Sequence, residues 1–340
     1  MNITLNDIAL RAEVSVATVS NVLRGKGKAS PETEDRIIRI AREMGYFEHT
    51  KVKTGLLGVI SCSMPGTSTS RSSDSSPREL ASYFTTEALE GIEDVASRNG
   101  YHILFQTLPT PTTEWDIPSM VKERLVEGVL VIGGTIPDEL ILALQQRAVP
   151  LVLLFTRIKT AAVDAILVDN YLGAFLAVQE LARRGHQRIG MINGWRATHT
   201  SEDKLEGFRD GLEMAGLSFK ESLYAEGDFT LSGGHRQTQQ LLHATGGPPS
   251  AIFVGDDVMA VGAIKAIKEA GLKVPEDVAV IGFGDSAIGA SWDPPLSTIR
   301  VPKRQMGAMA AERLLKLCRC ETRESMTLMI APELILRGSC

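Results

Sequence analysis

Side chains suited to contact DNA gather in a short segment near the N-terminus, residues 15–24, which read SVATVSNVLR. The small apolar side chains of Val16 and Ala17 can touch the methyl group of thymine, and the amide of Asn21 can pair with adenine through two hydrogen bonds. Neighbouring hydroxyls can contact phosphate oxygens. The segment therefore predicts a helix that enters the major groove. The alternative is a generic three-helix bundle in which the same hydroxyls only cap helices and bind water.

A second group of polar side chains follows the apolar run AIFVG at residues 251–255. Asp256 and Asp257 stand directly after this run, which has the length and composition of a buried strand. Open α/β sheets bind ligands beyond the carboxyl ends of their strands, and carboxylates accept hydrogen bonds from hydroxyl groups. The residues at such a strand end are therefore the ones to examine for a ligand site. The alternative is that either carboxylate only caps the helix that follows.

Motifs that would indicate an enzyme are missing from the sequence. It contains no Gly-rich loop ending in Gly-Lys-Ser/Thr, no Gly-x-Ser-x-Gly, no His-Glu-x-x-His and no Cys/His cluster at metal spacing. His186, in Arg-Gly-His-Gln, is typical of a turn between a helix and a strand. We therefore expect no enzyme, no metal ion and no cofactor.

Charge, cysteine usage and hydropathy point to the cytoplasm. The net charge is −5, yet residues 1–53 hold nine Lys and Arg against seven Asp and Glu, so a mildly basic head precedes an acidic body. The four cysteines form no CxxC pair, which favours free thiols. The N-terminus lacks the pattern of a signal peptide, and no apolar run reaches the roughly 18 residues of a membrane span. We expect a cytoplasmic protein without membrane contact.

Three helix starts would position the DNA-contacting segment. Thr4-Leu5-Asn6-Asp7 resembles a capping box, Ser15 can cap a helix over 16–23, and Ser30-Pro31 can open a longer helix to Met44. Gly25 and Gly45 can end the second and third helices. Apolar residues at helical spacing predict a small shared core of Ile8, Ala9, Val14, Val19, Leu23, Ile37, Ile40 and Met44. This arrangement leaves Val16, Ala17, Ser20 and Asn21 facing outward.

The stretch LNDIALRAEVSVATVSNVLRGKGKASPETEDRIIRIAREMGY resembles the DNA-binding head of the lactose-repressor (LacI/GalR) family. The resemblance implies that Val16, Ala17 and Asn21 read bases and that the hydroxyls, Arg24 and the start of the third helix contact the DNA backbone. Asn21 departs from the Arg or His that is common there, so we expect an operator that departs from the commonest family sequence. The predicted DNA-binding set is Thr4, Val16, Ala17, Thr18, Ser20, Asn21, Arg24 and Ser30.

The linker after the head lacks a pattern that the resemblance implies. In the family an Asn-x-x-Ala-x-x-Leu-like segment folds into a hinge helix on the operator, and its Leu wedges into the minor groove. Residues 46–55, YFEHTKVKTG, do not show this pattern and are several residues shorter. Because a wedge unstacks bases and bends DNA, we expect smaller bending here. Leu56 or Leu57 is an alternative wedge, although both favour a buried strand.

Strands and helices alternate from residue 56 onward in two similar series, which predicts parallel α/β units. The resemblance continues through residues 181–186, 226–229 and 251–285. It implies a periplasmic-binding-protein-like core in which the chain crosses between two lobes three times and an effector lies in the cleft. The predicted fold class is thus a small all-α helix-turn-helix head followed by a two-lobed α/β core with parallel sheets and helices on both faces.

The predicted domains follow from these patterns. They are a DNA-binding head at 1–47, a short linker at 48–55 and an effector-binding and dimerisation core at 56–340, with an N-lobe of about 56–157 plus 296–322 and a C-lobe of about 158–295 plus 323–340. The crossings are expected near 156–164, 285–295 and 321–325. A Ser/Thr-rich segment at 65–77 is longer than its loop needs, which favours a flexible surface loop, with a lid as the alternative.

The resemblance also implies which residues bind the effector. Lys204 stands where an Arg usually precedes Gly-Phe, and Phe229 stands where an aromatic ring commonly stacks on the ligand. The predicted effector-binding set is Arg157, Lys204, Phe229, Asp256 and Asp257. Gly284 replaces an Asp of the usual Gly-Phe-Asp-Asp, which would remove charge-assisted hydrogen bonds to a sugar. Arg157 also lacks the acid that often precedes it.

These observations predict a DNA-binding transcription regulator, and more specifically a repressor. A homodimer would bind a pseudo-palindromic operator in double-stranded DNA, with a sugar or related metabolite as effector. No heptad repeat follows the core, so a dimer is favoured over a tetramer. One alternative keeps the DNA-binding dimer but places its core under the control of a protein partner. A more distant alternative is a solute-binding protein.

Overall fold

The structure is a computed structural model that describes residues 3–23, 29–44, 54–62, 77–108, 117–133, 136–196, 198–322 and 324–340. The chain divides into two compact units. The first unit comprises Met1–Ser63, Gly91–Ala165 and Ala308–Thr327, and the second comprises Met64–Glu90, Ile166–Gly307 and Leu328–Cys340. The chain forms two six-stranded sheets, one of them within the second unit and the other mainly in the first, with the division falling inside two strands of the latter.

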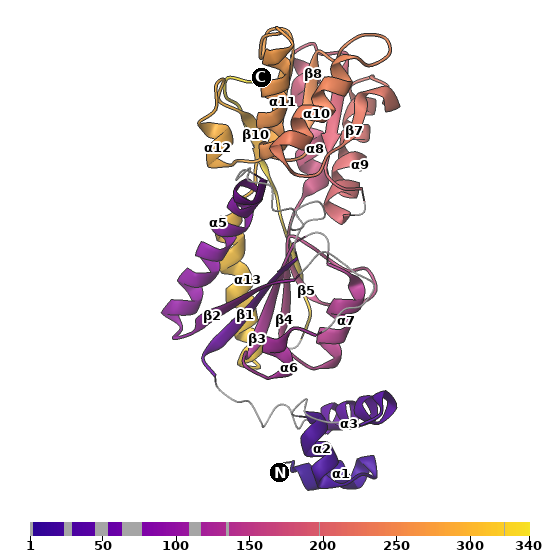
Figure 1. The fold of residues 1–340 in the computed structure, drawn as a ribbon, viewed down its shortest axis with the longest axis vertical. Coiled ribbons are helices and arrows are strands. Elements are labelled where there is room, and N and C mark those ends of the chain that lie inside the picture. The colour runs from indigo at the N-terminus through magenta and orange to yellow at the C-terminus, as the bar shows by residue number, and fades with distance from the viewer. Residues whose placement is uncertain are drawn as a thin grey trace. The chain divides into compact units, whose positions relative to one another are not determined.

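Three helices form the head of the first unit (Figure 1). They are α1 (Leu5–Ala12), α2 (Val16–Leu23) and α3 (Pro31–Glu43). The capping box at α1 is present, since the Asp7 carboxylate accepts from the Thr4 N–H at 2.7 Å and the Thr4 hydroxyl accepts from the Asp7 N–H at 3.4 Å. Ser15 Oγ accepts from the Thr18 N–H at 3.0 Å and so caps α2. Gly25 and Gly45 lie outside the described residues.

The core of the head confirms the predicted apolar pattern. Its buried members are Ile8, Ala9, Ala12, Val19, Val22, Leu23, Ile37, Ile40 and Ala41. Val14 and Met44 pack against this cluster while remaining partly exposed. Three of the buried members, Ala12, Val22 and Ala41, lie outside the predicted set. Burial of one stripe from each helix holds α2 in place and leaves its opposite face in solvent.

The first sheet has the strand order β11-β5-β4-β3-β1-β2. Its strands are β1 (Leu56–Cys62), β2 (His102–Leu108), β3 (Gly128–Ile132), β4 (Leu151–Leu154), β5 (Asp164–Val168) and β11 (Thr327–Ile330). β1 pairs with β2 and β3, and β3 with β4, in parallel register. The associated helices are α5 (Pro77–Arg98), α6 (Ser119–Lys122), α7 (Asp138–Gln146) and α13 (Lys303–Cys318).

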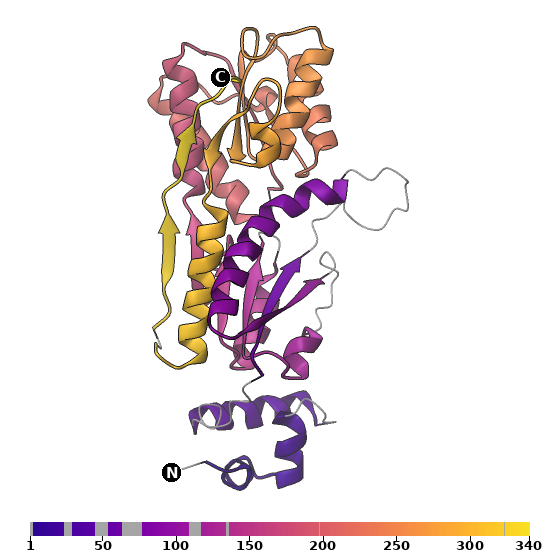
Figure 2. The same cartoon turned by 90° about the vertical axis from the view of Figure 1, so that its left-hand side faces the viewer.

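Helices cover both faces of this sheet. A Cβ added to Gly58 of β1 would lie 2.7 Å from the sulfur of Met120 in α6, whereas one added to Gly128 of β3 would lie 2.7 Å from the sulfur of Cys318 in α13. Gly58 pairs with Val129, so Gly58 and Gly128 point to opposite faces. α5 and α13 lie side by side (Figure 2), and Gly307 brings their backbones into close contact.

The second sheet has the strand order β12-β10-β9-β8-β6-β7. Its strands are β6 (Ile189–Asn193), β7 (Tyr224–Glu226), β8 (Ala251–Val254), β9 (Ala279–Gly284), β10 (Ser297–Arg300) and β12 (Glu333–Ile335). All the recorded pairings are parallel except that of β10 with β12. Its helices are α8 (Asn170–Arg183), α9 (His199–Met214), α10 (Leu231–Leu242), α11 (Asp257–Glu269) and α12 (Ala287–Ala290), with a short 3₁₀ turn at Glu221–Leu223.

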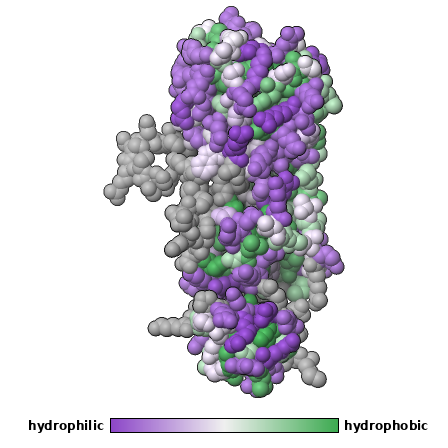
Figure 3. All heavy atoms as spheres, turned by 90° about the vertical axis from the view of Figure 1, so that its right-hand side faces the viewer, coloured by the Kyte–Doolittle hydropathy of each residue, from purple (hydrophilic) through white to green (hydrophobic). Residues whose placement is uncertain are grey.

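Glycines bring the helices of the second unit close to its sheet. Gly173 of α8 faces the ring of Phe283 in β9, whereas Gly282 of the same strand faces Asp257 of α11. Because neighbouring strand residues point to opposite faces, α8 and α11 cover opposite sides of the sheet. Polar side chains cover most of the second unit's face seen in Figure 3. The predicted α/β architecture, with parallel sheets and helices on both faces, is present.

The division into units differs from the predicted lobe boundaries. β5 joins the first sheet, and a division falls after Ala165, in addition to those after Ser63 and after Glu90. β10 pairs with β9 in the second sheet, so the next division falls after Gly307 and not after residue 295. The last falls after Thr327. α5 begins at Pro77, the last residue of the Ser/Thr-rich segment; residues 65–76 of that segment lie outside the described residues.

Candidate DNA-binding surface and effector site

The outward face of α2 carries the predicted base-reading residues. Val16 is 41% exposed, and Ala17 and Asn21 are also exposed. Val19 and Val22, on the other side of the helix, are buried in the head core. The helix therefore presents two small apolar side chains and one amide together, which are the groups that can recognise thymine and adenine.

Among the remaining predicted DNA-binding residues, Thr4, Thr18 and Ser30 lie at helix starts. The Thr18 hydroxyl is 2.8 Å from Ser15 Oγ, and Ser30 Oγ caps α3 by accepting from the Thr33 N–H at 3.3 Å. At α1 the hydrogen bonds from Thr4 lower the pKa of Asp7. Ser20 is partly buried. Arg24 lies outside the described residues.

Asp256 caps α11 in the second unit. Its Oδ1 accepts from the N–H groups of Val258 and Met259, at 2.8 and 3.3 Å. Burial, assisted by the neighbouring carboxylate of Asp257, raises the pKa of Asp256 to about 6. The helix cap that the sequence left open as an alternative is thus present, and an effector contact by Asp256 stays a prediction.

Asp257 is 2% exposed and is held by two donors. The Thr298 hydroxyl donates to its Oδ1 and the Ser286 N–H to its Oδ2, both at 2.6 Å. Burial raises the pKa of Asp257, while these hydrogen bonds act in the opposite direction. The carboxylate therefore links the first turn of α11 to β10 and to the segment that follows β9.

Gly284 lies beside this carboxylate. Its φ is +133°, and an added Cβ would be 3.6 Å from Asp257 Oδ2. A side chain would have room, but the backbone conformation strongly favours glycine. The sequence predicts the loss of a carboxylate at this position, and the structure shows that Ser286 and Thr298 donate to the two oxygens of Asp257.

Lys204 is a buried cation that is only 6% exposed. Its Nζ lies 4.2 Å from the centroid of the Phe283 ring, a cation–π contact. Among the described residues no hydrogen bond to this ammonium group is present. Burial lowers the pKa of Lys204 to about 8, although the carboxylates of Asp256 and Asp203 act against the shift. The ammonium is therefore short of polar partners in a place where charge is costly.

The ring of Phe229 lies against the backbone at the end of β6. A Cβ added to Gly194 would be 2.0 Å from Phe229 Cζ, and Phe229 has a left-handed φ of +60°. The ring also packs against the apolar core of the second unit while remaining partly exposed. Lys204, Phe229, Asp256 and Asp257 thus belong to the second unit, whereas Arg157 belongs to the first.

Sequence reasoning missed Lys303, which is 2% exposed. Its Nζ donates to the Gly284 carbonyl at 2.7 Å and lies 2.9 Å from a carboxylate oxygen of Glu87. A lysine at the first position of a helix opposes the helix dipole, and these two oxygens offset that cost. No pattern in the sequence distinguishes this lysine from the many that lie on protein surfaces.

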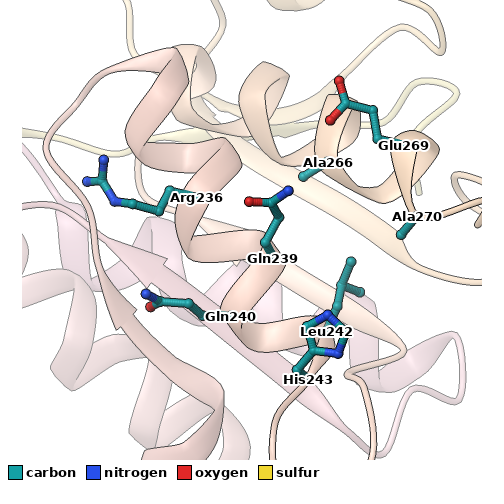
Figure 4. A pocket seen from close by; sticks show the side chains of 8 residues that line it. All are labelled: Arg236, Gln239, Gln240, Leu242, His243, Ala266, Glu269 and Ala270. Carbon is teal, nitrogen blue, oxygen red and sulfur yellow. The ribbon is translucent and has the colours of Figure 1, made fainter.

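A separate surface pocket of about 910 Å³ lies between α10 and α11 (Figure 4). It is lined by Arg236, Gln239, Gln240, Leu242, His243, Ala266, Glu269 and Ala270. None of the predicted effector residues lines it. Glu269, one of the lining residues, has a carboxylate oxygen 2.6 Å from Nε2 of His235, a hydrogen-bonding distance.

The described residues show no metal site, disulfide or membrane-spanning helix. No three His, Cys, Asp or Glu side chains there are grouped as metal ligands. Cys318, Cys320 and Cys340, the cysteines whose side chains the structure describes, are outside any disulfide. No helix in this part of the chain is long and apolar enough to cross a membrane.

Comparison with known proteins identifies relatives along the whole chain. The profile of bacterial regulatory proteins of the lacI family matches residues 4–48, and that of a periplasmic binding protein-like domain matches residues 178–340. The HTH-type transcriptional repressor CytR of Escherichia coli (strain K12) is 32% identical over 340 residues, covering 99% of this chain and 96% of that protein. The repressor PurR of Klebsiella pneumoniae (strain 342) is 31% identical, with the same coverage.

Solved structures show the same fold. The complex of the transcriptional regulator CelR with cellobiose superposes with a TM-score of 0.73 at 28% identity, covering 99% of this chain and 100% of that one. The Lac repressor dimer bound to operator and the anti-inducer ONPF has a TM-score of 0.69 at 24% identity, covering 100% and 99%. The predicted resemblance and fold class are thus confirmed, and the chain belongs to the lacI family of bacterial regulatory proteins.

Proposed function

We propose that this protein is a cytoplasmic transcriptional repressor that binds a pseudo-palindromic operator as a homodimer. Binding of a small metabolite is proposed to change its affinity for the operator. The observation that carries the proposal is the exposed face of α2, where Val16, Ala17 and Asn21 stand together on a helix fixed by the head core. Two such helices on a two-fold dimer would enter successive major grooves. The relatives named as repressors support the same direction of control.

Selection of operators from random duplexes by the full-length protein tests this proposal. At physiological salt we expect enrichment of a sequence with two-fold symmetry whose half-sites contain an adenine that Asn21 can contact. Affinity for the selected duplex is expected to fall steeply with salt, because several phosphates are contacted. A selection that enriches no symmetric sequence would contradict the proposal.

The effector is proposed to bind the second unit beside Lys204, Phe229 and the two aspartates. Support comes from the polar groups gathered after β8 and β9, which are strand ends where α/β sheets bind ligands. The buried ammonium of Lys204 can donate to ligand oxygens, and the ring of Phe229 can stack on a sugar or base. Arg157, which the sequence also predicts as an effector contact, belongs to the first unit.

A second candidate keeps the DNA-binding dimer but places its core under a protein partner. One observation favours it: the carboxylates of Asp256 and Asp257 already have hydrogen-bond donors within the second unit. A thermal-shift screen of sugars, sugar phosphates and nucleosides separates the two candidates. A ligand that raises the melting temperature, and loses this effect in Phe229→Ala, supports the metabolite. A screen without any such ligand favours the protein partner.

A further inference from the structure

The carboxylate of Glu127 holds the chain where it enters the first sheet. The Gly55 N–H donates to Glu127 Oε1 at 2.9 Å, and the Tyr101 hydroxyl donates to Oε2 at 3.0 Å. The Gly55 carbonyl accepts from the His102 N–H at 2.8 Å. Both backbone polar groups of residue 55 are therefore occupied. We call Gly55, Tyr101 and Glu127 the linker anchor.

The anchor is itself held by neighbouring elements of the first unit. The Glu127 N–H donates to the Leu56 carbonyl at 2.9 Å, and the thiol of Cys318 in α13 donates to the Glu127 carbonyl at 3.4 Å. Burial and the bond to Glu127 raise the pKa of Tyr101 to about 12, so its phenol stays protonated and keeps donating at neutral pH. The carboxylate thus has a fixed place between β1, β2 and β3.

The backbone turns sharply at the anchor. Gly55 has a φ of +68°, a left-handed conformation that favours glycine. The hydrogen bond from its N–H fixes the orientation of the peptide group that joins Thr54 to Gly55. The residues between Met44, which packs against the head core, and Gly55 connect the head to the first sheet, and we call them the tether.

The length of this tether bears on DNA recognition. An extended residue spans about 3.4 Å, close to the roughly 3.4 Å rise of one base pair along the duplex. Each residue that detaches from the start of β1 would therefore lengthen the tether by about one base-pair step. In a dimer that reads two half-sites, tether length limits the half-site spacings that both heads can reach.

We propose that Glu127 is a positioning residue for operator recognition: by clamping Gly55 it fixes the tether length and so makes the dimer select one half-site spacing. This inference rests on the proposed function, namely operator binding by a dimer. Glu127 contacts no DNA in this scheme. It acts through residue 55, and its removal would weaken the protein's discrimination among half-site spacings.

The test uses the full-length protein and the selected operator, with its central spacing changed by one and two base pairs in each direction. Fluorescence anisotropy gives the dissociation constant for each duplex. The wild type is expected to bind the altered spacings at least about tenfold more weakly than the best one. Glu127→Ala is expected to reduce this difference to about threefold or less, with affinity for the best spacing within about threefold of wild type.

A matched control removes the same kind of bond elsewhere. The Asp277 carboxylate accepts from the Lys273 N–H at 2.8 Å on the surface of the second unit. Asp277→Ala is expected to retain the spacing preference of the wild type.

Glu127→Gln keeps an acceptor for the Gly55 N–H and the shape of the side chain, but a neutral acceptor binds more weakly. It is expected to fold like the wild type and to show an intermediate preference.

The outcomes are distinct. Broadened spacing preference in both Glu127 variants supports the inference. An unchanged preference overturns it, and so does an equal loss of affinity at every spacing, which is what general destabilisation would produce. If Glu127→Ala does not fold, the preference of Glu127→Gln decides in the same way. A wild type that binds no operator overturns the proposed function and this inference with it, whereas a spacing-selective wild type with equally selective variants overturns the inference alone.

Discussion

Asn21→Ala is expected to weaken binding to the selected operator by at least about 30-fold. A bidentate amide–adenine pair contributes roughly 1–3 kcal/mol of discrimination, and a dimer loses one pair in each half-site. Asn21 is exposed on α2 and outside the head core, so its truncation leaves the fold intact. Titration of labelled operator at fixed salt measures the change, and thermal melting verifies the fold.

The loss should be confined to specific binding. Contacts to phosphates are independent of sequence, so affinity for random duplex and its salt dependence are expected to match the wild type. Gln239→Ala is a matched control, because it removes an exposed amide from α10 of the second unit. It should keep wild-type operator affinity within about twofold. An Asn21→Ala protein that binds the operator as tightly as the wild type would remove Asn21 from the base-reading set.

Lys204→Met is expected to stabilise the ligand-free protein while abolishing its response to the effector. The lysine is buried, and the described residues offer its ammonium group no hydrogen bond, only the face of Phe283 and nearby carboxylates. Replacing a poorly compensated buried charge by an apolar side chain of similar length should raise the free energy of unfolding at pH 7 by about 1–3 kcal/mol. Urea denaturation measures this change.

The stability that Lys204→Met gains over the wild type should decrease as the pH rises. The pKa of Lys204 is about 8 in the folded protein, below its usual value of 10.5. Between these values the unfolded wild type binds more protons than the folded one, so wild-type stability rises with pH. The advantage of Lys204→Met is therefore full at pH 7 and shrinks by pH 10. Other titrating groups are common to both proteins and cancel in the difference.

An exposed lysine provides the control. Lys265 lies on α11 with about half of its side chain in solvent, in a loose 3.9 Å pair with Glu269. Lys265→Met should change the free energy of unfolding by less than about 0.5 kcal/mol at either pH. If Lys204→Met instead lowers stability at pH 7, the ammonium group is well compensated in the fold. Burial of Lys204 would then carry no net cost to the stability of the wild type.

The head could be predicted almost completely from the sequence, because its signals are local. Thr4, Ser15 and Ser30 stand at helix starts, and apolar residues at helical spacing mark the buried stripes. The same periodicity left Val16, Ala17 and Asn21 outside. Ala12, Val22 and Ala41 were missed because the predicted stripe was too narrow.

The effector site was less predictable, because its contacts join residues far apart in the chain. The bonds of Asp257 come from Thr298 and Ser286, and those of Lys303 come from Gly284 and Glu87. A lysine or threonine at such a position carries no periodic signal. Strand membership was hard to predict for a similar reason, since only strand pairing assigns β5 and β10 to their sheets.

The buried thiol at the end of α13 makes the linker anchor chemically observable. Cys318 is 4% exposed and bonded to the Glu127 carbonyl, whereas Cys320, two residues later, is exposed. An alkylating reagent can reach Cys318 only when the last turn of α13 opens, while Cys320 reports the intrinsic rate of the reaction. Trypsin cleaves after Arg319 and separates the two thiols. The ratio of Cys318 labelling to Cys320 labelling therefore measures how readily the chain opens locally beside residue 55, without an engineered probe.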